Sequence, residues 1–159
     1  MAEIYKREVI KIGVITIIKE VKSIHPEEVV LVKLGGFYKS YGKDAYILSN
    51  LLGYKVKIEE EIVSVGFPVK SLNKVVATLE NKKVSYIILD SRDNYNVNTK
   101  MQFGNLNKYE KEFFKSNIYV KNKIRIEKIY EYLIKNSKKE SLKNKLKELE
   151  KIINEWRKI

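Results

Sequence analysis

The sequence predicts an α/β domain followed by a basic α-helical extension, and three observations lead to this prediction. Residues 28–91 alternate apolar runs typical of strands with amphipathic stretches typical of helices. Residues 92–107 are polar and are expected to form a linker or loop. Beyond this stretch, apolar residues recur every three or four positions, as in long helices. We therefore expect a domain over residues 1–91, a linker over 92–107 and a helical extension over 108–159.

A short helix is expected near the start of the domain. Val14, Ile17, Ile18 and Val21 recur at a spacing that places them on one helical face. The residues before Val14 alternate apolar and polar side chains as in a strand, so the start of the helix is left open. The helix should end before Pro26, because the residue that precedes a proline avoids the helical conformation.

The next elements expected are a strand, a turn and a helix. The apolar run 29–34 is typical of a buried strand, and the glycine pair 35–36 predicts a turn that closes it. Asp44 is expected to be the N-cap of a helix that runs through residue 52. Gly53 then follows as its C-cap.

The second half of the domain repeats this alternation. Apolar residues alternate over residues 54–62, which predicts a strand, and the Phe-Pro pair at 67–68 predicts a turn. Ser71 is expected to cap a helix whose apolar face spans residues 72–79. The apolar run 84–89 predicts the last strand of the domain.

The extension is expected to hold two helices with different surface chemistry. Apolar residues of the first helix are Ile124, Ile126, Ile129, Tyr130, Leu133 and Ile134. A regular stripe marks the second: Leu142, Leu146, Leu149, Ile153 and Trp156. Basic residues on and just before this second helix are candidates for contacts with phosphates: Lys138, Lys139, Lys143, Lys145 and Lys147. The regular stripe favours association with a protein partner or with a second copy, and the two interpretations are compatible.

The composition indicates a strongly basic globular protein. Of the 159 residues, 44% are hydrophobic and 33% charged, and the net charge of +12 favours a polyanionic partner such as nucleic acid. A Lys-rich composition typical of AT-rich genomes is the alternative explanation. The absence of cysteine excludes disulfides, thiol catalysis and cysteine-ligated zinc. No signal peptide or apolar run long enough to span a membrane is evident, so a cytoplasmic protein is expected.

Three groups of polar residues were considered as catalytic or metal sites. His25 is the only histidine, and beside a proline it is interpreted as a helix-end residue. The glutamates at 59–61 alternate between the two faces of a strand, which is poor geometry for a shared metal. Asp90, Arg92 and Asp93 lie in a polar loop. We therefore expect a protein without enzymatic activity, metal or cofactor.

Three segments resemble the N-terminal mismatch-recognition domain of MutS-type proteins. Residues 29–45, VVLVKLGGFYKSYGKDA, are similar to the strand, turn and helix of that family that carry its Gly-Asp-Phe-Tyr-Glu motif. The preceding His25-Pro26-Glu27 is similar to the family's His-Pro-Glu, with one inserted residue. Residues 66–90 resemble its Gly-Val-Pro turn, helix and final strand. The resemblance implies a mixed β-sheet with flanking helices.

The same resemblance implies a nucleic-acid-binding surface around the turn. It assigns Phe37 as a wedge between base steps, with Gly35 and Gly36 allowing close approach and Lys33, Tyr38 and Lys39 beside them. The residues alone leave open that Phe37 or Tyr38 is part of the core. Lys39 stands where the family has the glutamate that contacts the mispaired base, and Gly36 and Leu89-Asp90 also depart from the family pattern. Mismatch specificity is therefore not expected.

These features predict a nucleic-acid-binding accessory protein that binds DNA or RNA. The sequence has no G-x-x-x-x-G-K-[ST] motif, so the ATPase activity of MutS proteins is not expected. The resemblance also implies a possible setting, as a helper of a reverse transcriptase of the diversity-generating retroelement type. The alternative is a protein-interaction adaptor that keeps the MutS-like fold without binding nucleic acid.

Overall fold

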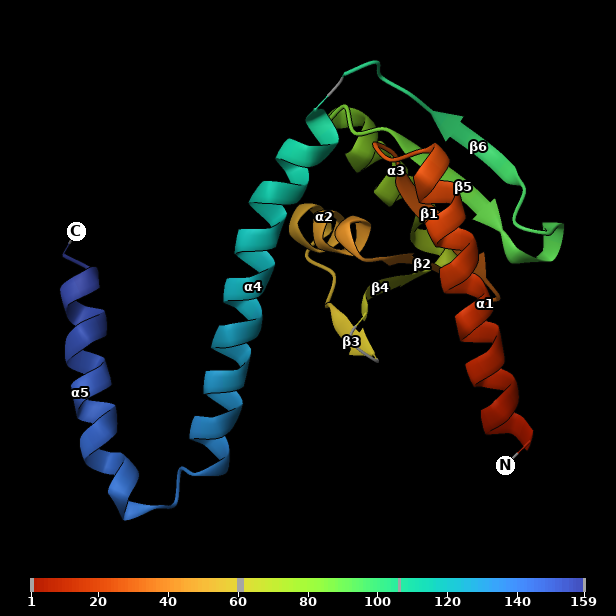
Figure 1. Cartoon of the computed structure of the whole chain (residues 1–159). Helices are drawn as coiled ribbons and strands as arrows, with labels where there is room; N and C mark the ends of the chain where they lie inside the picture. The colour runs from red at the N-terminus through yellow and green to blue at the C-terminus, as the bar shows by residue number, and fades with distance from the viewer. Residues whose placement is uncertain (1, 60–61, 106, 159) are drawn as a thin grey trace. The chain divides into compact units, whose positions relative to one another are not determined.

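The computed structural model describes residues 2–59, 62–105 and 107–158, with side chains from residue 13 onward except that of residue 59 (Figure 1). The chain divides into two compact units, Met1–Val120 and Lys121–Ile159, which are described separately.

The first unit contains six strands and most of the helices. In chain order these elements are α1 (Ala2–Ile24), β1 (Val29–Leu34), β2 (Phe37–Tyr41), α2 (Lys43–Leu52), β3 (Lys57–Glu59), β4 (Ile62–Pro68), the 3₁₀ turn η1 (Val69–Ser71), α3 (Leu72–Asn81), β5 (Tyr86–Asp90), the 3₁₀ turn η2 (Ser91–Asp93), β6 (Val97–Met101) and the first half of α4 (Lys108–Lys135).

The strands form one mixed sheet in the order β3-β4-β2-β1-β5-β6. Strands β1 and β5 run parallel, and every other neighbouring pair is antiparallel (Figure 1). The predicted α/β architecture with a mixed sheet and flanking helices is therefore confirmed. Strand β1 corresponds to the predicted run 29–34 and lies near the centre of the sheet.

Helices cover the two faces of the sheet unequally. On one face, α2 and α3 contribute Ala45, Ile47, Leu48, Val75 and Leu79 to the larger core, together with Tyr109 of α4. On the other face, α1 packs Val14 and Ile18 against residues of β1 and β5. The side chains from α1 in this second core therefore lie over the middle of the sheet. Gly66 of β4 lies on the same face of the sheet as α1, but it is exposed.

Several helix ends match the prediction. Helix α1 ends at Ile24, before Pro26, although it is long rather than short because it starts at Ala2. Gly53 closes α2 in the left-handed conformation with φ of 74°. Asp44 is not the N-cap of α2: the helix begins at Lys43 after Gly42, and the Asp44 side chain is buried. At α3, Ser71 precedes the helix without making a side-chain cap bond.

The strand boundaries required two corrections. The stretch 54–62 holds the short strand β3 and the start of β4, and the predicted turn at 67–68 is the end of β4. The expected linker 92–107 contains β6, which pairs with β5 and completes the sheet. Strand β6 escaped prediction because all its residues are exposed, so it has no apolar alternation. Glu60 and Glu61 lie outside the described residues.

The second unit contains the rest of α4 and helix α5 (Glu140–Trp156). The two helices predicted in the extension are present, but α4 begins in the first unit, where Tyr109, Glu112 and Ser116 are buried. Among the described residues, no helix combines the length and the apolar character required to cross a membrane.

Candidate nucleic-acid interface

The turn between β1 and β2 exposes its backbone. Gly35 adopts a φ of +60°, a left-handed conformation that favours glycine. The Gly36 carbonyl accepts a hydrogen bond of 3.1 Å from the Val69 amide, so the turn is anchored to the residue that follows β4. Both glycines are exposed, and a Cβ added to either would meet no atom within 4 Å. The space beside both glycines is therefore open for a ligand to approach the backbone.

The two aromatic residues that follow the turn, Phe37 and Tyr38, lie on opposite faces of strand β2. The Phe37 side chain is 54% exposed, whereas Tyr38 is only 6% exposed. Tyr38 stacks on Phe67 with ring centroids 5.7 Å apart and belongs to the larger core. The structure therefore places Tyr38 in the core, the alternative that the sequence left open, and its ring is engaged by Phe67. Phe37 is the aromatic ring that remains available.

Lys39 follows Phe37 on the same side of the strand. Neighbouring residues of a strand point to opposite faces, so residues two apart share a face. Lys39 is opposite Gly66 in the register of β2 and β4, and its Cγ lies 3.6 Å from the position that a Cβ on Gly66 would occupy. The Lys39 stem therefore lies across β4, and Phe37, Lys39 and exposed Gly66 define an open surface that we call the β2 surface.

Lys33 occupies the opposite face. It pairs with Tyr38 in the register of β1 and β2, and its Nζ lies 3.1 Å from a carboxylate oxygen of Asp90. The backbone N–H of Arg92 donates to Asp90 at 2.9 Å, and this bond together with Lys33 holds the pKa of Asp90 below its usual range. The positive charge of Lys33 is thus balanced by a carboxylate, and the residue does not join the β2 surface.

Two cations near the turn were not predicted to belong to the binding surface. Lys70 follows Val69, the residue hydrogen-bonded to Gly36, and is exposed. Arg92 lies in η2, beyond the end of β5, and is also exposed. The sequence offered no signal for either, because their proximity to the turn depends on the pairing of strands distant in the chain. Lys70 adds positive charge at the same end of the sheet, and Arg92, whose Nε lies 3.9 Å from an oxygen of Asp90, shares that carboxylate with Lys33.

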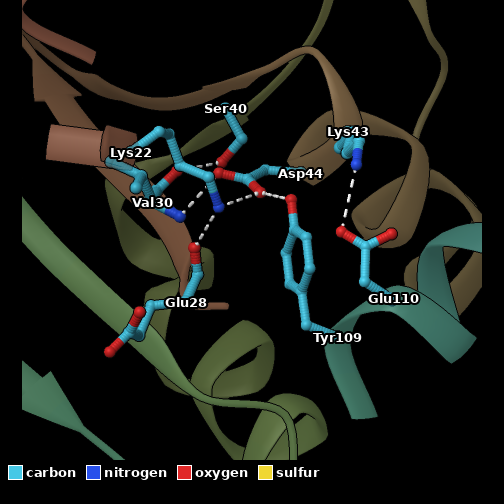
Figure 2. Close-up of polar contacts among 8 residues, drawn as sticks. All are labelled: Lys22, Glu28, Val30, Ser40, Lys43, Asp44, Tyr109 and Glu110. Carbon is cyan, nitrogen blue, oxygen red and sulfur yellow. Dashed lines mark hydrogen bonds and ion pairs between the residues drawn. The ribbon is translucent and has the colours of Figure 1, made fainter. Parts of the chain in front are cut away.

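A buried polar cluster lies at the other end of β2 (Figure 2). Asp44, 1% exposed, accepts hydrogen bonds from Lys22 at 3.0 Å, from the Val30 amide at 2.9 Å and from the Tyr109 hydroxyl. Lys22 also donates to the Glu28 carbonyl at 2.6 Å. The carboxylate of Asp44 therefore ties α1, β1 and the start of α4 to α2.

Burial governs the titration of this cluster. Desolvation raises the pKa of Asp44 against the opposing effects of Lys22, Tyr109 and the Val30 amide. Desolvation and the nearby Asp44 carboxylate raise the pKa of Tyr109. A cavity of about 440 Å³ adjoins the cluster, lined largely by apolar side chains that include Ile15, Ile18 and Ile62.

His25 has the surroundings of a structural residue. Its Nδ1 lies 3.7 Å from a carboxylate oxygen of Glu28 and 3.4 Å from the Lys100 Nζ. Gln102 donates to the same Glu28 at 2.6 Å, which links the start of β1 to the end of β6. These contacts connect the helix end to the sheet edge.

In the second unit, the predicted association residues differ in exposure. Leu142 is 6% exposed, Leu146 and Leu149 are half-buried, and Ile153 is 37% exposed. Lys138 and Lys139 lie in the connection between α4 and α5, and Lys143 and Lys147 lie on α5. Lys143 pairs with Glu140 within the helix at 3.4 Å.

Comparison with known proteins identifies the family. No match to a curated protein was found. The family model described as MutS domain I matches residues 12–118, about two thirds of the chain. The match includes the sheet, the turn at 35–36 and the elements joined by Asp44. The chain therefore belongs to the MutS domain I family.

Proposed function

We propose that the protein is a non-enzymatic accessory that binds nucleic acid through the β2 surface, without mismatch specificity. The observation that carries this proposal is the exposed ring of Phe37 beside a turn that admits close approach of a ligand. The neighbouring strand residue Tyr38 is buried, so exposure is specific to Phe37.

The chemistry of the β2 surface fits a bent or partly unstacked nucleic acid. An apolar wedge inserted between base steps kinks a duplex, and the kink is stabilised when cations neutralise the nearby phosphates. Phe37 supplies the wedge, and Lys39 supplies a cation on the same face. Lys70 and Arg92 provide further positive charge near the turn. The net charge of +12 adds a general attraction for polyanions.

Lys39 is the reason for excluding mismatch specificity from the proposal. An ammonium group only donates hydrogen bonds and carries a compact positive charge, so it contacts phosphates and base acceptors without distinguishing a mispaired base. A glutamate at this position would repel phosphates and accept hydrogen bonds instead. We therefore expect similar affinity for matched and mismatched duplexes.

A salt titration tests the proposal. Binding of the full chain to matched duplex, mismatched duplex, single-stranded DNA and single-stranded RNA would be measured by fluorescence anisotropy. Because phosphate contacts release counterions, affinity should fall at least tenfold over a roughly fourfold rise in salt. Failure to bind any of the four at low salt would contradict the proposal.

Substitutions then test the site. Phe37→Ala should weaken binding to duplex roughly tenfold, because the unstacked step loses its apolar partner. Phe114→Ala is the matched control, since Phe114 is 67% exposed but lies on α4. Equal effects of the two substitutions would show that the β2 surface is not the binding site.

Lys39→Glu should weaken binding to every substrate, and a selective gain for the mismatched duplex would show that specificity depends on this position.

The exposed apolar residues of the second unit favour a second candidate function. Ile126, Ile129 and Tyr130 of α4 are 65%, 56% and 63% exposed, which is typical of a surface that binds protein. The alternative is therefore an adaptor that uses the MutS domain I fold without nucleic acid.

A finer version of the main proposal is a cytoplasmic helper of a reverse transcriptase. Preference for RNA in the four-substrate comparison would favour it.

A further inference from the structure

Helix α5 carries an apolar stripe whose exposure increases along the helix. Leu142, near its start, is 6% exposed, whereas Ile153 and Trp156 near its end are 37% and 67% exposed. Leu146 and Leu149 between them are half-buried, so pairing with another helix would remove the exposed apolar surface of the second half of the stripe from water.

The spacing of the stripe is that of a coiled coil. Its members follow one another at intervals of four, three, four and three residues, which places Leu146 and Ile153 at a positions and Leu142, Leu149 and Trp156 at d positions. No polar residue interrupts these positions. A strict alternation of this kind fits a facing helix with the same repeat.

Charge distinguishes α5 from the segment that precedes it. Residues 121–139 contain seven Lys or Arg and two Asp or Glu, whereas α5 contains four Lys and four Glu and is neutral. Two copies of α5 can therefore approach without net repulsion between the helices, while residues 121–139 offer the better surface for a polyanion.

The charges beside the stripe are also self-complementary. Lys145 occupies a g position and Glu150 the following e position, and in a parallel coiled coil the g residue of one helix faces the next e residue of its partner. Each pair of helices would thus form two symmetric Lys145–Glu150 ion pairs. Antiparallel helices would instead place g opposite g, which separates Lys145 from Glu150.

We propose that α5 pairs with α5 of a second copy of the chain as a parallel two-stranded coiled coil. This proposal goes beyond nucleic-acid binding and does not depend on it. The helix has 17 residues, about two and a half heptads, so the pairing is weak and depends on concentration. Dimerisation would place two β2 surfaces in one particle.

Sedimentation equilibrium of the full chain tests the pairing. The chain mass is 18.7 kDa, and the average mass should rise toward about twice this value between roughly 5 and 500 μM protein. Leu149→Glu should keep the mass at that of one chain, because it places a charge in the seam. A native chain that remains a monomer throughout, or a dimer unaffected by Leu149→Glu, overturns the proposal.

Charge reversal tests the partner and its orientation. Lys145→Glu and Glu150→Lys should each weaken dimerisation roughly tenfold by opposing like charges, and the double variant should restore it. Lys147→Glu is the matched control, because it makes the same charge change at a b position outside the seam. Circular dichroism confirms that each variant keeps its helices. Weakening without rescue in the double variant overturns the proposal.

Disulfide trapping separates parallel from antiparallel helices. The chain has no cysteine, so Trp156→Cys introduces a single thiol at a d position. Parallel helices place the two thiols opposite one another, within the range that allows a disulfide. Antiparallel helices place a positions opposite d positions, so Trp156 would face Leu146 and the two thiols would lie about 15 Å apart. Rapid formation of the linked dimer supports the proposal, and its absence in a sample that sediments as a dimer overturns the parallel arrangement.

Discussion

The two ends of strand β2 hold opposite arrangements of apolar and charged side chains. At the start of the strand, the ring of Phe37 is 54% exposed, and beyond the end of the strand the carboxylate of Asp44 is 1% exposed. Both arrangements depart from the ordinary partition of apolar residues to the interior and charges to the surface. The buried carboxylate of Asp44 accepts hydrogen bonds from three donors, whereas the exposed ring of Phe37 belongs to neither hydrophobic core.

Under the proposed function, stability and binding depend on opposite ends of one strand. Asp44 joins four elements of the first unit, so its loss should affect folding. Phe37 lies outside both hydrophobic cores, so its loss should affect binding and leave folding intact. The predictions below test this separation, beginning with the largest expected effect on stability.

Asp44→Ala should lower the free energy of unfolding by about 3–5 kcal/mol, because it leaves Lys22, the Val30 amide and the Tyr109 hydroxyl without their shared acceptor. Chemical denaturation at neutral pH measures the change. Lys43→Ala is the control: its ion pair with Glu110 is exposed, so the loss should stay below about 1 kcal/mol. Similar losses for the two variants would contradict the role assigned to Asp44.

Tyr109→Phe should cost about 1–3 kcal/mol, since it removes the hydroxyl donor to Asp44 while keeping the ring in the core. The same denaturation measurement applies. In the Asp44→Ala background, Tyr109→Phe should cost much less, because the acceptor is already absent. An undiminished cost in that background would mean that the hydroxyl stabilises the fold through another contact.

Acidification should increase the stability that Asp44 contributes. Burial raises the pKa of Asp44 above the ordinary value near 4, so the folded chain takes up a proton before the unfolded chain as the pH falls. The contribution is therefore complete below the unfolded pKa and is lost as the pH rises through the folded pKa. The difference in unfolding free energy between the native chain and Asp44→Asn should grow from pH 7 toward about pH 4. A difference that shrinks over this range would show that the pKa of Asp44 is lowered instead.

Phe37→Ala should change the free energy of unfolding by no more than about 0.5 kcal/mol, because an exposed side chain is lost from the surface. Tyr38→Ala, one residue away, should cost about 3–5 kcal/mol because it empties part of the core. Thermal unfolding of the two variants provides the comparison. A large loss for Phe37→Ala would place this ring in the core rather than on a binding surface.

Most of the central fold could be predicted from apolar periodicity, but its edges could not. Strand β1 and helix α3 carry clear apolar patterns, and both are present. The residues of strand β6 all fall among the exposed ones, and the strand is held by backbone pairing with β5, which leaves no apolar pattern in its side chains. Turn signals also failed at the Phe-Pro pair 67–68, because a proline at the end of β4 is compatible with a strand.

The sequence predicted which candidate residues share a face of the strand, but not which of them are buried. Phe37 and Lys39 emerge on one face, as their spacing of two requires once the strand is known. The roles of Tyr38 and Asp44 depend on which side of the sheet carries the core, and that follows from packing with Phe67 and Tyr109, which are distant in sequence. Sequence patterns over a few residues cannot predict such contacts.

The packing of Lys39 has a consequence for what the proposed surface recognises. The Lys39 side chain is half-buried, its stem lies beside Gly66, and it stands on the face of β2 opposite to the core residue Tyr38. Under the proposed function, replacing this lysine with glutamate would exchange a group that attracts phosphate for one that accepts hydrogen bonds from a base edge, while strand register and turn stay the same. One substitution on the surface would then change what the scaffold recognises.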